Sequence, residues 1–246
     1  MTGPLISVIL PVYNMGRYLA EAIASIQAQR YEPIEILVID DGSTDDTPKV
    51  AARFGDAIRY IRKPNGGAAS ARNAGLHEAR GEIIATLDAD DQWPENKLAL
   101  QVPRLLAADE PDVVSGRIRY VELPGALMLD YRFEGPDQTV AHIHLGAALY
   151  RRRAFDQVGG FDESLRVGDD QDWFLRAREL GLKIVVMHEV TLLYRLHDSN
   201  MTRGATAEKL ELAAVIRKSL ERRRKAGGVA KELPAWSSFD DPKGPE

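Results

Sequence analysis

Three aspartates lie within four residues, in the sequence DADD at 88–91, directly after the apolar run IIATL at 83–87. Gly81 precedes the run and Pro94 follows it, which predicts a short strand buried on both faces of a parallel sheet. Open α/β sheets bind ligands beyond the carboxyl ends of such strands. Carboxylates crowded there repel one another unless a cation lies among them, and their oxygens suit Mg²⁺ or Mn²⁺ bound with a diphosphate. The alternative is an acidic turn that caps the helix expected from Glu95.

Two further polar segments each follow a predicted strand: PVYN at 11–14 and DDGS at 40–43. The phenol of Tyr13 suits stacking on a nucleobase. A carboxylate in the second segment suits a base N–H or a ribose hydroxyl. The alternative for both segments is helix capping, by Asn14 in the first and by a hydroxyl side chain in the second.

A glycine-rich segment, NGGAASARNAG at 65–75, has the composition of a turn that opens a helix. Glycines at a helix start let backbone N–H groups approach a ligand closely, and Arg72, one turn into the helix, offers two parallel donors to a phosphate. The chain has no G-x-G-x-x-G after its first predicted strand and no G-x-x-x-x-G-K-[ST] anywhere. Dinucleotide-type and P-loop binding are therefore disfavoured.

Strands and helices alternate over the first hundred residues. Hydrophobic patterning predicts strands at 5–10, 34–39, 58–61 and 82–87, and helices at 18–29, 45–54 and 68–79. This order is typical of βαβ units and a mainly parallel sheet. In the second half the patterning predicts strands at 113–121, 145–150 and 183–186, and helices from 95, at 152–158 and at 170–180. A mobile excursion is expected at 122–141. After 206 we expect an amphipathic helix with Leu212, Ile216 and Leu220 on one face.

Composition narrows the class of protein. The 246 residues are 44% hydrophobic and 28% charged, which is ordinary for a globular protein, and the net charge of −5 argues against a general nucleic-acid binder. Cysteine is absent, which excludes disulfides and thiolate metal sites. No apolar run approaches the roughly 18 residues of a membrane span, and no basic region precedes the N-terminal apolar run. We therefore expect a cytoplasmic protein without a transmembrane span or signal peptide.

Basic residues gather near the C-terminal end. Residues 203–225 hold eight Lys or Arg against three Glu, a balance of +5 in a chain that is otherwise −10. Residues 217–225 could make a peripheral contact with an anionic membrane at its inner face. The favoured alternative is a helix C-terminus whose cations complement the helix dipole. Residues 226–246 are polar and predicted to be disordered.

In order and spacing, the segments at 7–14, 38–45, 65–75 and 81–91 resemble the nucleotide-sugar-binding half of the inverting glycosyltransferases of family 2, which have the GT-A fold. The resemblance implies an α/β fold with a mainly parallel central sheet flanked by helices. A Rossmann-like nucleotide-binding half at 1–100 is then fused to an acceptor-binding and catalytic-base half at 101–202 of the same domain. A basic amphipathic helix at 203–225 and the tail at 226–246 would follow.

The second half agrees with the same family. GGFDE at 159–163 resembles a family turn, and DDQDWFLR at 169–176 resembles the family segment E-D-x-x-x-x-x-R, with Asp169 where Glu is usual. By position Asp170 matches the catalytic base. Neighbouring acids would raise its pKa, and the helix dipole would oppose them.

The resemblance also implies a nucleoside diphosphate sugar donor, with UDP favoured over dTDP and GDP, and a Mn²⁺ or Mg²⁺ cofactor held by Asp90, with help from His197. Base contacts would come from Tyr13 and from Asp40 or Asp41. The full set of expected donor-binding residues is Pro11, Val12, Tyr13, Asp40, Asp41, Asn65, Gly67, Arg72, Asp88 and Ala89. For the acceptor, a carbohydrate, lipid-linked or small-molecule hydroxyl, we expect Trp93, His144, Asp169 and Trp173, with core packing the alternative for both tryptophans.

Two other functions fit part of the pattern. A nucleotidyltransferase shares the sheet and the carboxylates, but usually needs a Gly-rich basic turn directly after the first strand, where this chain has PVYN at 11–14. A non-catalytic sugar-nucleotide-binding module would lose a base or a metal-binding acid, and this chain keeps both. The sequence therefore favours a metal-dependent glycosyltransferase of polysaccharide or glycoconjugate synthesis.

Overall fold

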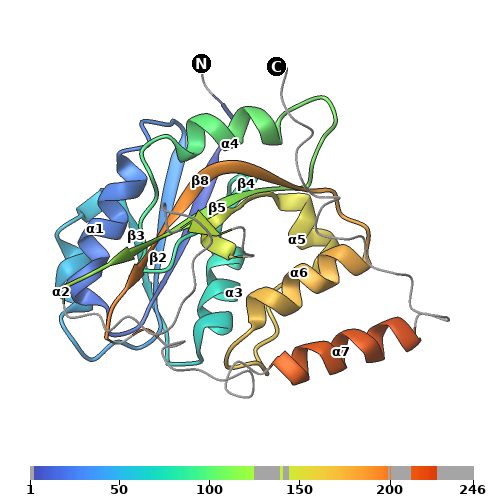
Figure 1. The fold of residues 1–246 in the computed structure, drawn as a ribbon. Helices are drawn as coiled ribbons and strands as arrows, with labels where there is room; N and C mark the ends of the chain where they lie inside the picture. Colours follow the sequence, from blue (N-terminus) through green and yellow to red (C-terminus); the bar gives the residue numbers. More distant parts are fainter. Residues whose placement is uncertain (1–2, 125–138, 141–143, 199, 201–211, 226–246) are drawn as a thin grey trace.

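The structure, a computed structural model, describes residues 3–124, 139–140, 144–198, 200 and 212–225 (Figure 1). The predicted C-terminal tail and most of the predicted excursion lie outside these residues. The elements are β1 Ile6–Val12, α1 Gly16–Gln27, β2 Ile34–Asp40, α2 Thr47–Ala52, β3 Arg59–Arg62, α3 Ala68–Glu78, β4 Ile83–Thr86, α4 Lys97–Leu105, β5 Val113–Glu122, β6 Thr139–Val140, β7 Leu149–Arg151, α5 Arg152–Val158, α6 Asp169–Glu179, β8 Ile184–Leu196 and α7 Leu212–Lys225.

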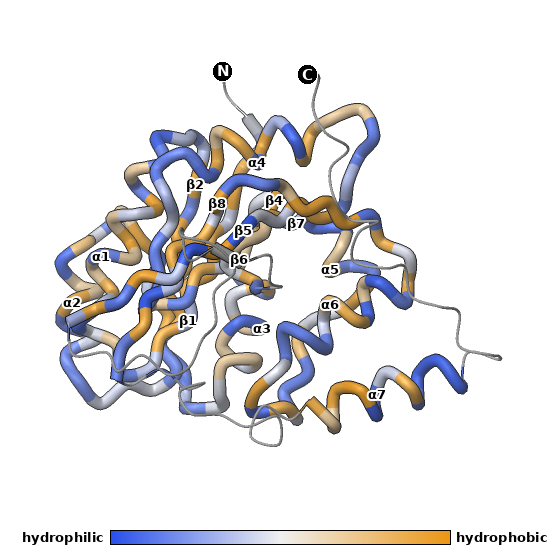
Figure 2. Tube along the Cα trace, viewed as in Figure 1, coloured by the Kyte–Doolittle hydropathy of each residue, from blue (hydrophilic) through white to orange (hydrophobic). Residues whose placement is uncertain are grey.

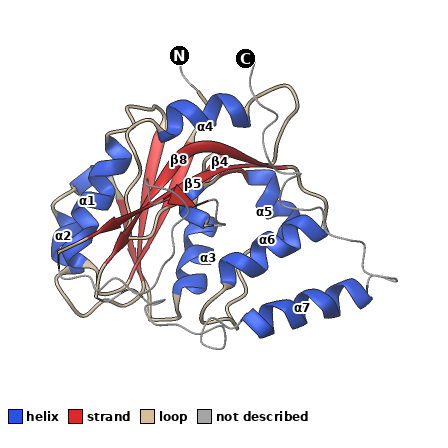
Figure 3. Ribbon diagram, in the orientation of Figure 1, coloured by secondary structure: helices blue, strands red, loops and turns tan. Residues whose placement is uncertain are grey.

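Within the described residues, one eight-stranded sheet runs through both halves of the chain, in the order β3-β2-β1-β4-β7-β5-β6, with β8 paired to β5. Figure 3 shows strands of this sheet in red among the helices. The strands β1 to β4 pair in parallel, as their βαβ connections require. The strand β7 runs antiparallel to β4 and to β5. The carboxyl ends of β1, β2 and β4 therefore meet at one edge of the sheet.

Helices cover both faces of the sheet, and Figure 2 shows the apolar strands between them. Alternate residues of β1 face opposite layers: Val8 and Leu10 pack with α1, α2 and α4, whereas Ile9 packs with α3, α5 and α6. This two-residue period is the geometry of a strand with two buried faces. In α3, a Cβ on Gly75 would lie 2.3 Å from Ile9, so the glycine lets the helix approach the strand closely.

Two predicted elements differ from the observed ones. The strand expected at 145–150 begins only at Leu149, after a 3-10 turn at Leu145–Ala147. The carbonyl of Ala147 does not need a strand partner, because the side chains of Gln101 and Thr191 both donate hydrogen bonds to it. The strand expected at 183–186 continues to Leu196 and pairs with β5 along its length. The middle of this strand is exposed and polar, so hydrophobic patterning does not predict that the strand continues.

The apolar face predicted for α7 does not point into the protein. Val215 is 2% exposed, whereas Ile216 is 56% and Leu220 is 39% exposed. The helix instead packs its Val215 and Ser219 side against the rest of the chain. Among the described residues, no helix combines the length and apolarity needed to cross a bilayer.

Candidate active site

The acidic segment at 88–91 forms a tight turn at the carboxyl end of β4, where the backbone N–H of Asp91 donates to the carbonyl of Asp88 at 3.0 Å. The strand before it is wholly buried, as its apolar sequence predicts. The side chain of Asp88 is 28% exposed and that of Asp90 is 20% exposed. The turn therefore presents carboxylates beyond the sheet edge, at the position where α/β sheets bind ligands.

Arg72 joins this turn to a helix from the second half of the chain. Its Nη2 donates to Asp88 Oδ1 at 2.8 Å, and its Nη1 donates to Asp169 Oδ2 at 2.7 Å. The guanidinium side chain is 9% exposed. Its Nε has no hydrogen-bond partner within the described part of the chain. The predicted phosphate-binding arginine thus brings the acidic turn and the start of α6 into one site.

The predicted base, Asp170, lies at the start of α6, next to this ion-paired cluster. Gly168, with φ of +81°, precedes the helix in a left-handed conformation that glycine adopts without strain. Burial and the adjacent Asp169 raise the pKa of Asp170 from 3.8 to about 6, while Arg72 opposes the rise. A carboxylate with a pKa near 6 is a stronger base than an exposed one and is still ionised at neutral pH.

Asp91 contributes a feature that the sequence did not single out. Its Oδ1 accepts from the backbone N–H of Arg195 at 3.0 Å, but its buried Oδ2 has no partner among the residues described. Burial, with Asp90 and Asp88 nearby, raises the pKa of Asp91 well above its ordinary range. An orphaned, buried carboxylate oxygen costs free energy unless a proton or a cation meets it.

Asp91 also belongs to a group of three side chains whose ligand atoms lie close together. One ligand atom each from Asp88, Asp91 and His144 lies within 4.8 Å of the other two. Burial acts to raise the pKa of Asp88, but Arg72 and His144 outweigh it and hold the pKa below its ordinary value. The predicted acceptor residue His144 therefore lies beside the acidic turn, with its Nε2 3.9 Å from Asp88 Oδ2.

The predicted metal ligands Asp90 and His197 are also in contact. Nε2 of His197 lies 3.1 Å from Asp90 Oδ2, and the imidazole packs against the ring of Tyr18 at 4.6 Å between centroids. Asn200 contacts the same Nε2 at 3.1 Å. The end of β8 therefore reaches back over the acidic turn, and both predicted ligands lie at one place.

Arg195 holds that end of β8 against the turn. The side chain is 2% exposed, and its Nε donates to the carbonyl of Asp90 while its Nη1 contacts Glu21 of α1. The sequence analysis predicts a metal-binding role for His197 but none for Arg195. The sequence shows only that an arginine lies two residues before the predicted ligand His197, and its burial required the structure.

The expected donor residues lie at the ends of β1 and β2 and in the turn before α3. Tyr13 is 48% exposed, so its ring face is open, whereas Pro11 and Val12 are buried. The buried carboxylate of Asp41 accepts from Lys63 and from the backbone N–H groups of Gly66 and Gly67. The glycine N–H groups expected to meet a ligand are therefore taken by Asp41, which corrects that prediction.

Asp40 and Asn65 also have internal partners. Asp40 Oδ1 accepts from the backbone N–H of Ser43 at 2.7 Å, and its Oδ2 accepts from the hydroxyl of Tyr60. Asn65 donates to the carbonyl of Asp41 at 2.9 Å. Ala89 is 3% exposed and packs in the core. These contacts shape the edge of the sheet.

The side chains expected to cap helices at 11–14 and 40–43 instead bond to the neighbouring loop. Asn14 does not cap α1; its Oδ1 accepts from the backbone N–H of Thr44 at 2.7 Å. In return, Asp45 Oδ2 accepts from the N–H of Gly16 at 3.0 Å, in the first turn of α1. The two parallel strands end side by side, so each loop lies closer to the neighbouring helix start than sequence distance indicates.

Both tryptophans expected at the acceptor site are core residues. Trp93 is 3% exposed and its indole N–H donates to the carbonyl of Gly146 at 3.1 Å. Trp173 is fully buried, and its N–H donates to Gly159. A buried ring has no open face for a pyranose, so the prediction of sugar contacts is wrong for both and the packing alternative holds.

Residues 7–159 match the family model described as Glycosyl transferase family 2. An uncharacterised glycosyltransferase of Rickettsia typhi is 35% identical over 233 residues, which cover 87% of this chain and 70% of the relative. The chondroitin synthase of Pasteurella multocida is 30% identical over 229 residues, 90% of this chain but 24% of that much longer protein.

Solved structures share the fold at lower identity. Residues 1–349 of TarS from S. aureus, in complex with UDP-GlcNAc, match with a TM-score of 0.72 and 21% identity, over 94% of this chain and 68% of that one. A mannosyltransferase from Pyrobaculum calidifontis, in complex with GDP-Man and Mn²⁺, matches with a TM-score of 0.60 and 22% identity, over 92% of this chain and 66% of that one. The architecture is therefore that of these transferases.

Proposed function

This chain belongs to glycosyltransferase family 2 and transfers a sugar from a nucleotide sugar, and on that premise we propose that it moves the sugar of a UDP-sugar onto an acceptor hydroxyl with inversion. The observation that supports this most directly is the double ion pair of Arg72. It connects Asp88 at the expected donor site to Asp169, the neighbour of the expected base. The expected donor site and the start of the base helix are therefore joined through one side chain.

In the proposed reaction, Asp170 accepts the proton of the acceptor hydroxyl as that oxygen attacks the anomeric carbon. The bond from this carbon to the diphosphate breaks on the opposite face, so one displacement inverts the anomeric centre. Arg72, whose two Nη atoms donate to Asp88 and Asp169, would place its positive charge beside the diphosphate. Its positive charge also keeps the pKa of Asp170 from rising further.

The divalent ion, Mn²⁺ or Mg²⁺, would be held in the acidic turn, with Asp90 and His197 as the ligands expected from sequence. The Oδ2 of Asp91, which has no hydrogen-bond partner in the described part of the chain, favours a second set, Asp88, Asp91 and His144. When bound, the ion would offset the negative charge that grows on the diphosphate.

Single substitutions separate the two ligand sets. Asp90→Asn and Asp91→Asn are each titrated with UDP, with and without Mn²⁺. The true ligand's variant loses the Mn²⁺-dependent part of UDP affinity, whereas the other keeps most of it. If both variants bind UDP as the wild type does in Mn²⁺, the ion is not held in this turn.

The donor assignment is tested by adding UDP-, dTDP- and GDP-sugars to the wild type with Mn²⁺ and measuring nucleotide release. UDP- and GDP-sugars are included because TarS was solved with UDP-GlcNAc and the mannosyltransferase with GDP-Man. We expect fastest release from a UDP-sugar. Release of pyrophosphate from a nucleoside triphosphate instead would support a nucleotidyltransferase.

For the acceptor we propose a carbohydrate, lipid-linked or small-molecule hydroxyl approached by His144 and Asp169, because both border the cluster that holds Asp170 and Asp88. The enzyme would then act in polysaccharide or glycoconjugate synthesis. Varying the acceptor at saturating donor checks this: His144→Ala raises the acceptor KM more than the donor KM if His144 serves the acceptor. The reverse result would assign His144 to the ion with Asp88 and Asp91.

We propose a cytoplasmic enzyme that contacts the inner membrane face through the outward side of α7. There Arg217 and Lys225 lie exposed beside Ile216 and Leu220. Basic side chains with adjacent apolar ones are typical of a helix that lies on an anionic bilayer. Co-sedimentation with vesicles containing phosphatidylglycerol, but not with pure phosphatidylcholine vesicles, would support this contact; equal recovery with both would contradict it.

A further inference from the structure

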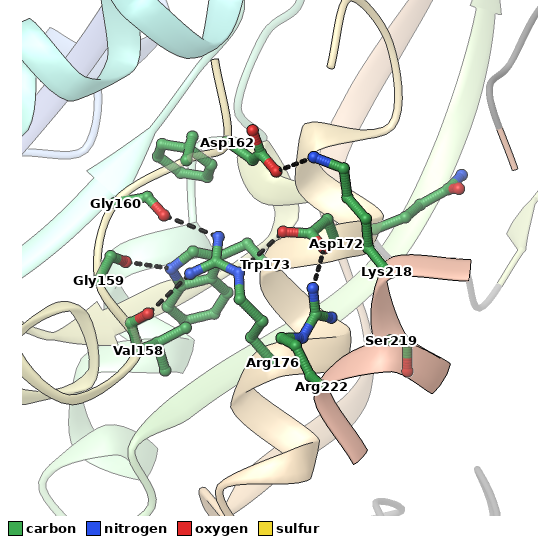
Figure 4. Close-up of polar contacts among 12 residues, drawn as sticks. Val158, Gly159, Gly160, Asp162, Asp172, Trp173, Arg176, Lys218, Ser219 and Arg222 are labelled. Carbon is green, nitrogen blue, oxygen red and sulfur yellow. Dashed lines mark hydrogen bonds and ion pairs between the residues drawn. The ribbon is translucent and has the colours of Figure 1, made fainter. Parts of the chain in front are cut away.

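The C-terminal helix α7 packs along α6, the helix that begins with the expected base (Figure 4). Arg222 of α7 reaches two acids on one side of α6. Its Nη1 donates to Asp172 Oδ1 at 2.9 Å, and its Nε donates to Glu179 Oε2 at 2.8 Å. Ser219, one turn earlier in α7, donates to the other oxygen of Glu179.

Asp172 is the deepest of these groups. Its side chain is 1% exposed and accepts from two arginines, Arg176 of its own helix at 2.8 Å and Arg222 of α7. A buried carboxylate needs such partners, because desolvation penalises its charge. Arg176 is itself committed elsewhere, to the carbonyls of Val158 and Gly160 at 2.7 Å. Arg222 therefore gives Asp172 a second charged partner, and the two arginines together balance the two acids Asp172 and Glu179.

A second contact joins α7 to the turn at 159–163. Lys218 donates to Asp162 and to Ser164. Burial acts to raise the pKa of Asp162, but Lys218 and the hydrogen bonds from Ser164 outweigh it and lower the pKa to about 2. The turn is held on its other side by Asn73 of α3, which donates to Phe161. Thus α7 forms ion pairs both with α6 and with the turn at 159–163, as the dashed lines from Arg222 and Lys218 in Figure 4 show.

The position of α6 matters because its first turn holds Asp169, bonded to Arg72, and Asp170. Asp172 lies only two residues beyond the expected base. The anchoring contacts are charged, and the apolar contribution from α7 is small, with Val215 and Ser219 its buried residues. A shift of α6 after loss of these contacts would move Asp170 directly.

We propose that α7 is a clamp on the catalytic-base helix, and that Arg222 is a positioning residue that acts through Asp172 on Asp170. This inference rests on the proposed role of Asp170 as the base. It assigns to the basic C-terminal segment an effect on the chemical step in addition to any contact of its outward face. Arg222 touches neither donor nor acceptor in this assignment.

The test measures kcat, the KM for the UDP-sugar and the Kd for UDP in Arg222→Met, at a temperature where circular dichroism shows the variant folded. We expect kcat to fall about 5- to 50-fold, because small displacements of a catalytic group are costly. The Kd for UDP stays within about twofold of the wild type, since the donor residues lie on other elements. Arg222→Lys should recover part of the loss, because one ammonium reaches one acid but not both.

Arg224→Met is the matched control. It removes the same charge from the same helix, but from an exposed position, and is expected to keep the wild-type kcat. A double-mutant cycle with Asp172→Asn tests the route: in that background Arg222→Met should lower kcat by less than about twofold, because coupled residues do not act additively.

Three outcomes overturn the clamp. Arg222→Met could keep the wild-type kcat, it could weaken UDP binding as strongly as it lowers kcat, or it could lower kcat equally with and without Asp172→Asn. Asp170→Asn is measured in parallel. If it loses turnover while Arg222→Met does not, the base assignment stands and only the clamp is refuted. If it keeps turnover, the base assignment fails and the clamp fails with it.

Discussion

Replacing Asp170 by Asn should slow the enzyme and stabilise it at the same time. Burial and Asp169 raise the pKa of this carboxyl from 3.8 to about 6, so the folded chain holds its proton more tightly than the unfolded chain does. Between these two values the folded state binds more protons. The free energy of unfolding of the wild type therefore falls as pH rises from about 4 to about 6, and this contribution is constant above that range.

The size of the effect follows from the shift. About two pKa units correspond to at most about 3 kcal/mol at neutral pH, an upper limit because the side chain is only partly buried. Asparagine is uncharged, so it does not carry the cost of a buried ionised carboxylate. It also loses the attraction between a carboxylate and the start of α6, which contributes about 0.3–1 kcal/mol. We expect Asp170→Asn to be more stable than the wild type by about 1–2 kcal/mol at pH 7 and to show no gain below about pH 4.

The assays are denaturant unfolding at several pH values and nucleotide release in the presence of acceptor. Turnover of Asp170→Asn should fall at least about 10²-fold, and the wild-type kcat should rise with pH through about 6, where the base ionises. Asp156→Asn makes the same chemical change on the exposed side of α5 and should alter neither property. Wild-type turnover by Asp170→Asn would refute the base assignment; lost turnover without a stability gain at pH 7 would refute the burial argument.

Three other substitutions test separate parts of the structure. Arg72→Met removes a positive charge from the donor site, so UDP affinity should fall at least about tenfold in a titration. Because Arg72 lowers the pKa of Asp170, the pH at which kcat rises should also move higher in this variant, and an unchanged pH profile would contradict this. Burial holds the pKa of Lys97 well below its ordinary value, so the wild type gains stability as pH rises, and Lys97→Met should raise the free energy of unfolding more at about pH 6 than at about pH 9. Trp93→Ala should cost about 3–5 kcal/mol in denaturant unfolding by opening a core cavity, and a loss of turnover without destabilisation would restore the sugar-binding role.

Local patterning determined the strands and helices of the first half and the edge where the polar segments gather. Apolar runs such as 83–87 are long enough to specify a buried strand, and parallel connections bring the carboxyl ends of such strands together. The family match over 7–159 agrees with that arrangement. The acidic turn could thus be placed before any contact was known.

The faces of side chains and long-range partners required the tertiary structure. Arg72 and Asp169 lie 97 residues apart in the chain, and the backbone of Arg195 binds Asp91 across 104 residues. No local period encodes such pairs, because they depend on how separate elements pack. The same reason explains why the sequence does not place Trp93: an indole ring suits a sugar-binding cleft as well as a packed core.

The chain by itself therefore determined the family, the sheet and the types of group available for catalysis. The helix α7 shows what it left open: its sequence has an apolar stripe, yet the side that packs inward carries Val215 and Arg222. That choice follows from Asp172 and Glu179, two acids on α6 that need partners once buried. Hydrophobic periodicity is local, whereas the balance of buried charge is decided by the elements that fold against each other.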